Sequence, residues 1–312
     1  MVRVALLAVA LAAHVQSLRL QQTSSRGHSV SSLNMGVSQD SGRNLAYTTT
    51  EGAVLSYDLF RASPRSVNEP PIVFLPGLIR QKNEIKATTL QSWSRKNDYT
   101  FFCADYMGVG RSSGIFSDGT VGRWASDTIQ LLDSVVGRDK ANNKAILVGH
   151  GVGAWVSFLV AARRPDLVSG IVGMAADPDF TEELLWKKLP EATKEKIMRE
   201  GVADITWGTE VYPISRALIE DGRENLLLTS NLLRKVNCPV RLVHALDDEE
   251  VPYELAIQLI HKCASPDASC TLIKGAQHSL DSEQDMKVMR ESIMEILTAF
   301  RGDYDLTSPG SG

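Results

Sequence analysis

Residues Lys144 to Pro165, KAILVGHGVGAWVSFLVAARRP, decide how the rest of the chain is interpreted. The run at 145–148, Ala-Ile-Leu-Val, is continuously apolar, as expected for a strand that is covered on both faces. The run from Ala154 to Ala162 is apolar enough for a helix that packs against a sheet. Between them lies Gly149-His150-Gly151-Val152-Gly153, so this stretch predicts a buried strand, a tight turn and a helix in immediate succession.

The turn has the spacing of a nucleophile elbow, Gly-x-Ser-x-Gly, but its central residue is Gly151. A nucleophile at this point is held in a strained backbone conformation that costs about 1 to 3 kcal/mol, which glycine avoids. Glycine also has no side-chain atom that attacks a carbonyl carbon, so no acyl-enzyme can form at this position. The sequence therefore predicts the elbow without its nucleophile.

Around this stretch, strand and helix patterns alternate from Asn44 to Phe300. The expected strands are Val54–Phe60, Ile72–Leu75, Tyr99–Ala104, Val168–Met174, Val240–Ala245 and Ser269–Ile273, and the other expected helices are Asn83–Lys96, Arg123–Val136, Pro252–Cys263 and Gln284–Phe300. Such alternation builds an α/β fold with a mostly parallel sheet, and ligands collect at the carboxyl ends of its strands. We expect one domain over residues 42–301, followed by a flexible tail at 302–312.

Residues 177–235 interrupt this alternation with a long, charged segment that is mostly helical in pattern. The segment lies between two expected core strands. It is interpreted as a cap insertion over the site, and the alternative is a peripheral helical decoration.

The first 41 residues are interpreted as a leader. Met1 to Ala13 has one basic residue followed by an apolar run, the layout of a secretory signal peptide. The serine-rich segment behind it has no acidic residue before Asp40, a composition typical of transit peptides. A two-part plastid leader and a plain signal peptide for secretion are both open, with mitochondrial import as a further alternative.

Composition restricts the partners. The chain of 312 residues has a formal net charge of −4, and its first 39 residues contain arginine but no acid, so the remainder is more acidic still. This argues against a nucleic-acid partner. We expect no transmembrane span in the mature protein, no metal and no cofactor. Cys263 and Cys270 flank a short segment that could form a disulfide in an oxidising compartment.

Two polar residues follow later strands in the order that a hydrolase triad requires. Asp248 comes after the strand that ends at Ala245, and His278 comes after the last strand. In a triad the acid fixes the histidine tautomer and stabilises its cation, while the histidine moves the proton. We interpret Asp248 and His278 as the acid and the base, with Gly151 at the nucleophile position.

At these residues the chain resembles the α/β-hydrolase family, and within it the subfamily of mitochondrial palmitoyl-protein thioesterases that also act as acyl-glucuronide esterases. The resemblance extends from about Asn44 to Phe300. It is carried by Asn44-Leu-Ala-Tyr47, Phe74-Leu-Pro-Gly77, Asp105-Tyr-Met-Gly-Val-Gly110, Thr120-Val-Gly-Arg-Trp124, Val236-Asn-Cys-Pro-Val-Arg-Leu242, the Asp248 loop and His278. It implies hydrolysis of acyl esters or thioesters by a serine nucleophile, with the backbone N–H groups of Leu78 and Val152 as oxyanion donors.

Two hypotheses follow from Gly151. Loss of a triad nucleophile lowers kcat by about 10⁶-fold, which favours a catalytically impaired protein that binds a small apolar ligand. The alternative is an active esterase or thioesterase in which His278 and Asp248 activate a water molecule. We expect no other residue to replace the nucleophile. His150 should point away from the pocket, and Ser112 and Ser113 should cap a following helix.

Overall fold

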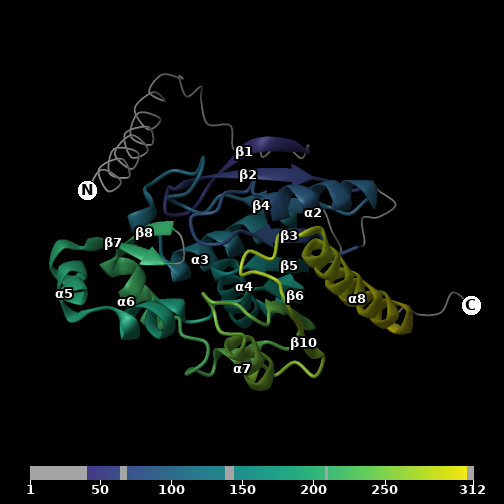
Figure 1. Ribbon diagram of the computed structural model, residues 1–312. Coiled ribbons are helices and arrows are strands. Elements are labelled where there is room, and N and C mark those ends of the chain that lie inside the picture. The colour runs from purple at the N-terminus through teal and green to yellow at the C-terminus, as the bar shows by residue number, and fades with distance from the viewer. Residues whose placement is uncertain (1–40, 64–68, 138–143, 208–209, 308–312) are drawn as a thin grey trace, which may run out of the picture. The chain divides into compact units, whose positions relative to one another are not determined.

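A central sheet of eight strands runs through the described part of this computed structural model, which comprises residues 41–63, 69–137, 144–207 and 210–307 (Figure 1). The strand order is β1-β2-β4-β3-β5-β6-β9-β10. The bounds are β1 Gly42–Thr48, β2 Val54–Phe60, β3 Ile72–Leu75, β4 Phe101–Ala104, β5 Ala145–His150, β6 Val168–Met174, β9 Val240–Ala245 and β10 Ala268–Ile273. Pairing is antiparallel from β1 to β2 and from β2 to β4, and parallel across the rest of the sheet. The predicted mostly parallel sheet is confirmed, and β1 is an addition at its edge.

Helices cover both faces of this sheet (Figure 1). One apolar cluster includes side chains of α3, α4 and α7, and the other includes side chains of α2 and α8. Two layers of helix explain why strands such as β3 and β5 are buried along their whole length. The helix bounds are α2 Ile85–Lys96, α3 Val121–Leu131, α4 Val152–Arg163, α5 Glu191–Glu200, α6 Arg216–Glu224, α7 Glu254–Lys262 and α8 Glu283–Thr307.

The β5–turn–α4 unit has the arrangement that the opening stretch predicts. Every residue of β5 is buried, and α4 is buried from Val152 to Ala162. The turn closes because the glycines on either side of its centre have no side chains. A Cβ on Gly149 would lie 2.3 Å from the backbone of Gly153, and one on Gly153 would lie 2.0 Å from the carbonyl oxygen of Leu75.

Residues 177–235 contain a strand pair that the helical interpretation of this segment missed. Strands β7 Val202–Trp207 and β8 Glu210–Ser215 pair in antiparallel fashion between α5 and α6. Alternate residues Ala203 and Ile205 are buried, a period of two that is typical of strands. Gly201, with φ of 85°, ends α5 in the left-handed region just before β7.

The structure describes the last helix almost to the end of the chain but does not describe the first 40 residues. Helix α8 continues to Thr307, beyond Phe300, where the expected helix ends. The flexible tail at 302–312 stays a prediction. Residues 308–312 and the predicted leader, up to residue 40, lie outside the described residues.

The predictions of a disulfide and of no membrane span can be compared with the described residues. Cys103, Cys238, Cys263 and Cys270 are all free, so the suggested Cys263–Cys270 disulfide is not formed. The Cys263 thiol instead donates a hydrogen bond to the carbonyl of Ile260 at 3.3 Å. In the part of the chain that the structure covers, none of the helices combines the length and apolarity needed to cross a bilayer.

Candidate active site

Gly151 lies at the carboxyl end of β5, at the first turn of α4. Its φ of 54° and ψ of −121° are strained for a residue with a side chain, as at a nucleophile elbow. Its backbone N–H donates to the carbonyl of Met174, the last residue of β6, at 3.0 Å. A Cβ built on Gly151 would find Asp177 Oδ2 at 3.4 Å, an ordinary van der Waals distance. The elbow therefore has room for a side chain that the sequence does not provide.

The structure brings Asp248 and His278 into direct contact. His278 Nδ1 lies 2.9 Å from Asp248 Oδ2, across 30 residues of sequence. The Asp248 side chain is fully buried, whereas that of His278 is 21% exposed and lines the pocket beside Gly151. With Nδ1 bonded to the acid, Nε2 is the ring nitrogen that can exchange a proton with a bound molecule.

Asp248 is held from several sides. Its Oδ1 accepts the backbone N–H groups of Glu250 and Val251, each at 2.9 Å. Its Oδ2 also lies 3.4 Å from Nε2 of His244, a fully buried side chain of β9. Burial alone would raise the pKa of Asp248, but hydrogen bonds from His244, His278 and Val251 outweigh it and hold the pKa below its ordinary value. The carboxylate is thus charged and fixed in orientation.

The predicted oxyanion donors lie in two segments that meet at the elbow. Parallel pairing of β3 with β5 places Leu75 opposite Gly149, so the loop after β3 passes beside the turn. Leu78 in this loop lines the pocket. Val152 is the first residue of α4, where backbone N–H groups have no partner within the helix and favour negative charge. Val152 itself is not among the lining residues of the pocket, and the oxyanion role of the two N–H groups stays a prediction.

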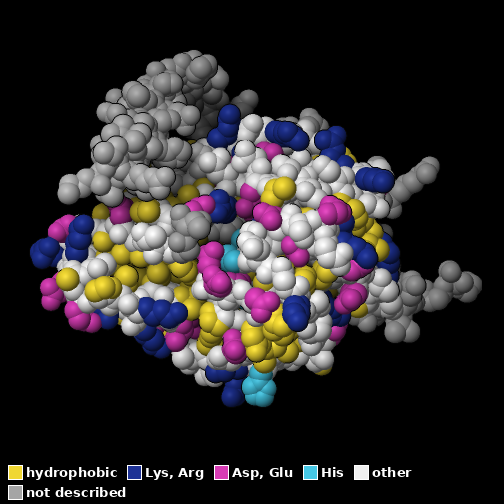
Figure 2. Space-filling view, in the orientation of Figure 1, with side chains coloured by type: hydrophobic (Ala, Val, Ile, Leu, Met, Phe, Trp, Pro, Cys, Tyr) yellow, Lys and Arg dark blue, Asp and Glu magenta, His cyan; other side chains and the backbone are white. Residues whose placement is uncertain are grey.

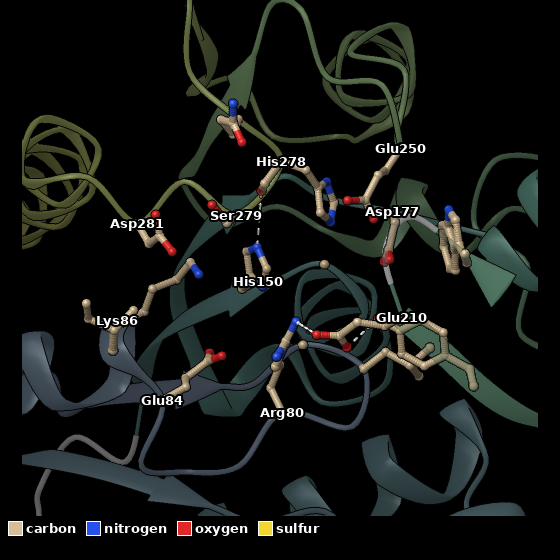
Figure 3. A pocket seen from close by; sticks show the side chains of 17 residues that line it. Arg80, Glu84, Lys86, His150, Asp177, Glu210, Glu250, His278, Ser279 and Asp281 are labelled. Atoms are coloured by element: carbon tan, nitrogen blue, oxygen red, sulfur yellow. Dashed lines mark hydrogen bonds and ion pairs between the residues drawn. The ribbon is translucent and has the colours of Figure 1, made fainter. Parts of the chain in front are cut away.

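These segments surround a pocket of about 460 Å³, within the usual size range of small-molecule sites. Figure 3 shows side chains from separate loops converging on it, and Figure 2 shows a histidine recessed among acidic side chains on this face. Its lining is rich in charge, with the carboxyl groups of Glu84, Asp177, Glu210, Glu250 and Asp281 and the basic groups of Arg80 and Lys86. The aromatic residues Trp207 and Tyr212 come from the 177–235 segment.

Comparisons with known proteins agree with this geometry. A sequence profile described as the alpha/beta hydrolase fold matches residues 70–206. Bovine mitochondrial palmitoyl-protein thioesterase ABHD10 is 31% identical over 231 residues, which is 73% of each chain. The chain belongs to the α/β-hydrolase family.

Solved structures of other α/β hydrolases are similar over most of this chain. Mouse alpha/beta hydrolase domain-containing protein 10 superposes with a TM-score of 0.71 at 27% identity, covering 82% of this chain and 98% of that chain. A putative hydrolase from Agrobacterium vitis gives a TM-score of 0.73 at 25% identity, covering 83% and 98%. The predicted resemblance to the palmitoyl-protein thioesterase subfamily is thereby confirmed.

The side chain of His150, next to Gly151, lies in a different place from the one that the sequence predicted. His150 lines the pocket instead of pointing away from it, and its Nε2 lies 3.4 Å from the carbonyl of His278. The ring has room because Gly77 has no side chain: a Cβ there would lie 2.9 Å from His150 Nδ1. Burial holds the pKa of His150 well below its usual value, so the ring is neutral.

The serines of the Asp105 loop also have a different role from the one expected. Ser112 Oγ donates to the carbonyl of Asp105 and accepts the N–H of Ser56, and Ser113 Oγ accepts the N–H of Val54. They tie the loop to β2, so the expectation that they cap a helix is wrong.

Sequence reasoning did not single out two further residues near the site, His244 and Asp177. His244 stands four residues before Asp248 on a buried strand, a position that could have indicated a contact with the acid. Asp177 lies three residues after the end of β6 and is thus at the same sheet edge as the elbow. Only the tertiary structure shows how close it lies to Gly151.

Proposed function

We propose that the protein binds an acyl ester or thioester in this pocket and hydrolyses it slowly, by direct attack of water, without an acyl-enzyme. The observation that supports this most is the contact between Asp248 and His278 at 2.9 Å beside an elbow that contains only glycine. A histidine oriented by a carboxylate can act as general base toward water as well as toward a serine hydroxyl. The charged lining of the pocket favours a ligand with a polar portion over a purely apolar one.

The expected rate is low. Loss of the nucleophile costs about 10⁶-fold in kcat, while the oxyanion donors and substrate binding of such a site retain about 10³- to 10⁴-fold over water. An ordinary enzyme turnover of about 10 per second would fall to about 10⁻⁵ per second. This is a family member with impaired catalysis.

A second candidate function is binding without turnover. It is supported by the absence of a side chain at Gly151, because a bound ester then meets no nucleophile of the protein at that point. The two candidates share the ligand class and differ only in whether water attacks it.

Of two assays on the full chain, the first tests for another nucleophile and the second distinguishes these functions. A fluorophosphonate probe should leave the protein unlabelled, and labelling at the pocket residue Ser279 would instead identify another nucleophile. The slow release of p-nitrophenol from p-nitrophenyl butyrate should fall to background in His278→Ala. If the variant and the native chain release it equally, binding without turnover is the better description.

Targeting also belongs to this proposal. The matched palmitoyl-protein thioesterases, bovine and human among them, carry the word mitochondrial in their names, which supports the mitochondrial alternative over secretion or a plastid. Fusion of residues 1–41 to a fluorescent protein, imaged with organelle markers, tests this directly. Signal in the secretory pathway or in a plastid would contradict the mitochondrial proposal.

A further inference from the structure

Asp177 is the carboxyl group nearest to the place where an elbow side chain would project. Its Oδ2 lies 3.4 Å from the ideal Cβ position of Gly151. The residue is only 4% exposed, and its Oδ1 is buried without a hydrogen-bond partner among the described residues. Asp177 lines the same pocket as Gly151 and His278, and Figure 3 shows it there with His278 and Glu250. A buried polar atom without a partner calls for an explanation.

We propose that Asp177 is a positioning residue whose carboxyl group holds the attacking water beside Gly151, where other family members have the serine hydroxyl. This inference rests on the proposed water-dependent hydrolysis. It adds a residue that the Asp248–His278 pair and the backbone donors do not include.

The geometry suits a bound water. A buried water makes two to four hydrogen bonds to polar partners. We place the water where a hydroxyl on a Gly151 Cβ would stand. The ideal Cβ is 3.4 Å from Asp177 Oδ2, the oxygen that faces the elbow, and both Asp177 and His278 line this pocket. The two O–H bonds of the water then point to Asp177 and to His278 Nε2, which leaves an oxygen lone pair for the substrate carbonyl.

The chemical step balances with water as the sole co-reactant. The water oxygen bonds to the carbonyl carbon as His278 Nε2 takes one proton, and the backbone N–H groups of Leu78 and Val152 stabilise the oxyanion. The bond from carbon to the alcohol oxygen or thiol sulfur then breaks, and His278 returns the proton to the leaving group. Asp177 retains its hydrogen bond to the second O–H throughout and forms no bond to carbon.

The environment of Asp177 favours this role over nucleophilic attack. Burial above all, with the nearby charges of Asp248 and Glu250, raises the pKa of Asp177 well above its usual range. A neutral carboxyl group is a poor nucleophile, but its carbonyl oxygen still accepts a hydrogen bond.

Three variants test the role of Asp177 in p-nitrophenyl butyrate hydrolysis. Asp177→Asn keeps a carbonyl acceptor and should retain turnover within about 3-fold, whereas Asp177→Leu removes the acceptor and should lose about 10- to 100-fold. The matched control is Asp204→Asn, an exposed position on β7, which should not change turnover. Equal losses in Asn and Leu variants would overturn the positioning role.

Two further measurements keep the inference separate from folding and from the proposed function. In a Gly151→Ser background, Asp177→Leu should still label with the fluorophosphonate, and loss of labelling would assign Asp177 a structural role. A crystal structure of the native chain should show an ordered water bonded to Asp177, absent from Asp177→Leu. If native turnover proves independent of His278, the proposed function fails, and the presence or absence of that water alone decides the inference.

Isotope labelling tests for attack by the Asp177 carboxyl. Single turnovers in H₂¹⁸O should place the label in the released acid and leave the Asp177 peptide unlabelled in mass spectra. Label in Asp177 would show that its carboxyl attacks the substrate, which would overturn the positioning role.

Discussion

Glycine at position 151 separates two properties that a serine at an elbow combines. The backbone keeps φ of 54° and ψ of −121°, and glycine reaches this conformation without the strain that a side chain would add. The hydroxyl is lost, while the Asp248–His278 contact is retained at 2.9 Å. At the scale of single residues, the protein therefore has an unstrained elbow together with the Asp248–His278 pair.

Gly151→Ser should therefore gain activity and lose stability together. The new hydroxyl projects into the pocket that His278 lines, so we expect fluorophosphonate labelling and a rise in ester turnover of several orders of magnitude, up to about 10⁶-fold. The strained backbone should lower the free energy of unfolding by about 1 to 3 kcal/mol. Denaturant titration and ester assays of the same preparation measure both changes. A folded variant that stays unlabelled would show that the assigned triad is wrong.

Asp177 should make stability depend on pH. Its pKa is raised in the folded state, so the folded protein keeps a proton that the unfolded chain releases above about pH 3.9. The contribution of this group is fully present below that pH and is lost as pH rises toward the folded pKa, by at most about 1.4 kcal/mol per pH unit. Asp177→Asn should be more stable relative to the native chain at pH 7 than at pH 4. Urea denaturation of both proteins at the two pH values measures this difference in the free energy of unfolding. An equal difference at pH 4 and pH 7 would refute the prediction.

At the scale of the element, the close packing of the β5–turn–α4 unit against β3 decides the position of the site. Gly153 allows α4 to approach the backbone at Leu75, and the same approach brings the β3 loop with Leu78 beside the elbow. Packing and oxyanion geometry thus depend on one contact.

Gly153→Ala should destabilise the fold strongly. The new Cβ would lie 2.0 Å from the Leu75 carbonyl oxygen, and the obstacle is backbone that cannot rotate away. We expect a loss of about 3 kcal/mol or more in the free energy of unfolding, at the upper end for overpacking. The control is Gly302→Ala in α8, where nothing lies within 4 Å. Its expected effect is a gain of up to about 1 kcal/mol from helix propensity, measured by thermal and urea denaturation. Similar values for both variants would contradict the argument from close approach.

At the scale of the whole molecule, the site is assembled from loops that follow β3, β5, β6, β9 and β10 and from the 177–235 segment. Trp207 and Tyr212 of this segment line the pocket, and Arg80 bonds Glu210 across it at 2.7 Å. These contacts support the prediction that the segment caps the site. The exposed Arg80–Glu210 pair adds little stability by itself, so the aromatic lining is the better point for a test.

Trp207→Ala should weaken the binding of long acyl chains more than that of short ones. Removing this ring, which stacks on Phe180 at 5.3 Å, takes away apolar surface from the cap side of the pocket. We expect KM for p-nitrophenyl octanoate in the Gly151→Ser background to rise about 10-fold, with a smaller change for the acetate. Trp93→Ala on α2, outside the pocket lining, is the matched control. An equal effect of Trp207→Ala on both esters would mean that the acyl chain does not reach this segment.

The fold class and most of the sheet could be predicted from the amino-acid sequence, because apolar runs and their spacing depend on local chemistry. Four strands, β2, β3, β6 and β9, have the predicted bounds. The order Gly151, Asp248, His278 was also readable, since each residue follows a predicted strand. The strand pair β7–β8 was not recognised, because two short alternating runs between helices give a weak local pattern.

Tertiary structure alone decided which groups face Gly151. The carboxyl of Asp177, the ring of His150 and the buried His244 behind Asp248 depend on how neighbouring strands end at one sheet edge. Strand register and the close approaches that glycines allow set these distances. The glycines can be identified in the sequence, but the register and the segments that approach them cannot. Local sequence thus specifies the helices and strands, and the packing of distant segments specifies which groups surround the pocket at Gly151.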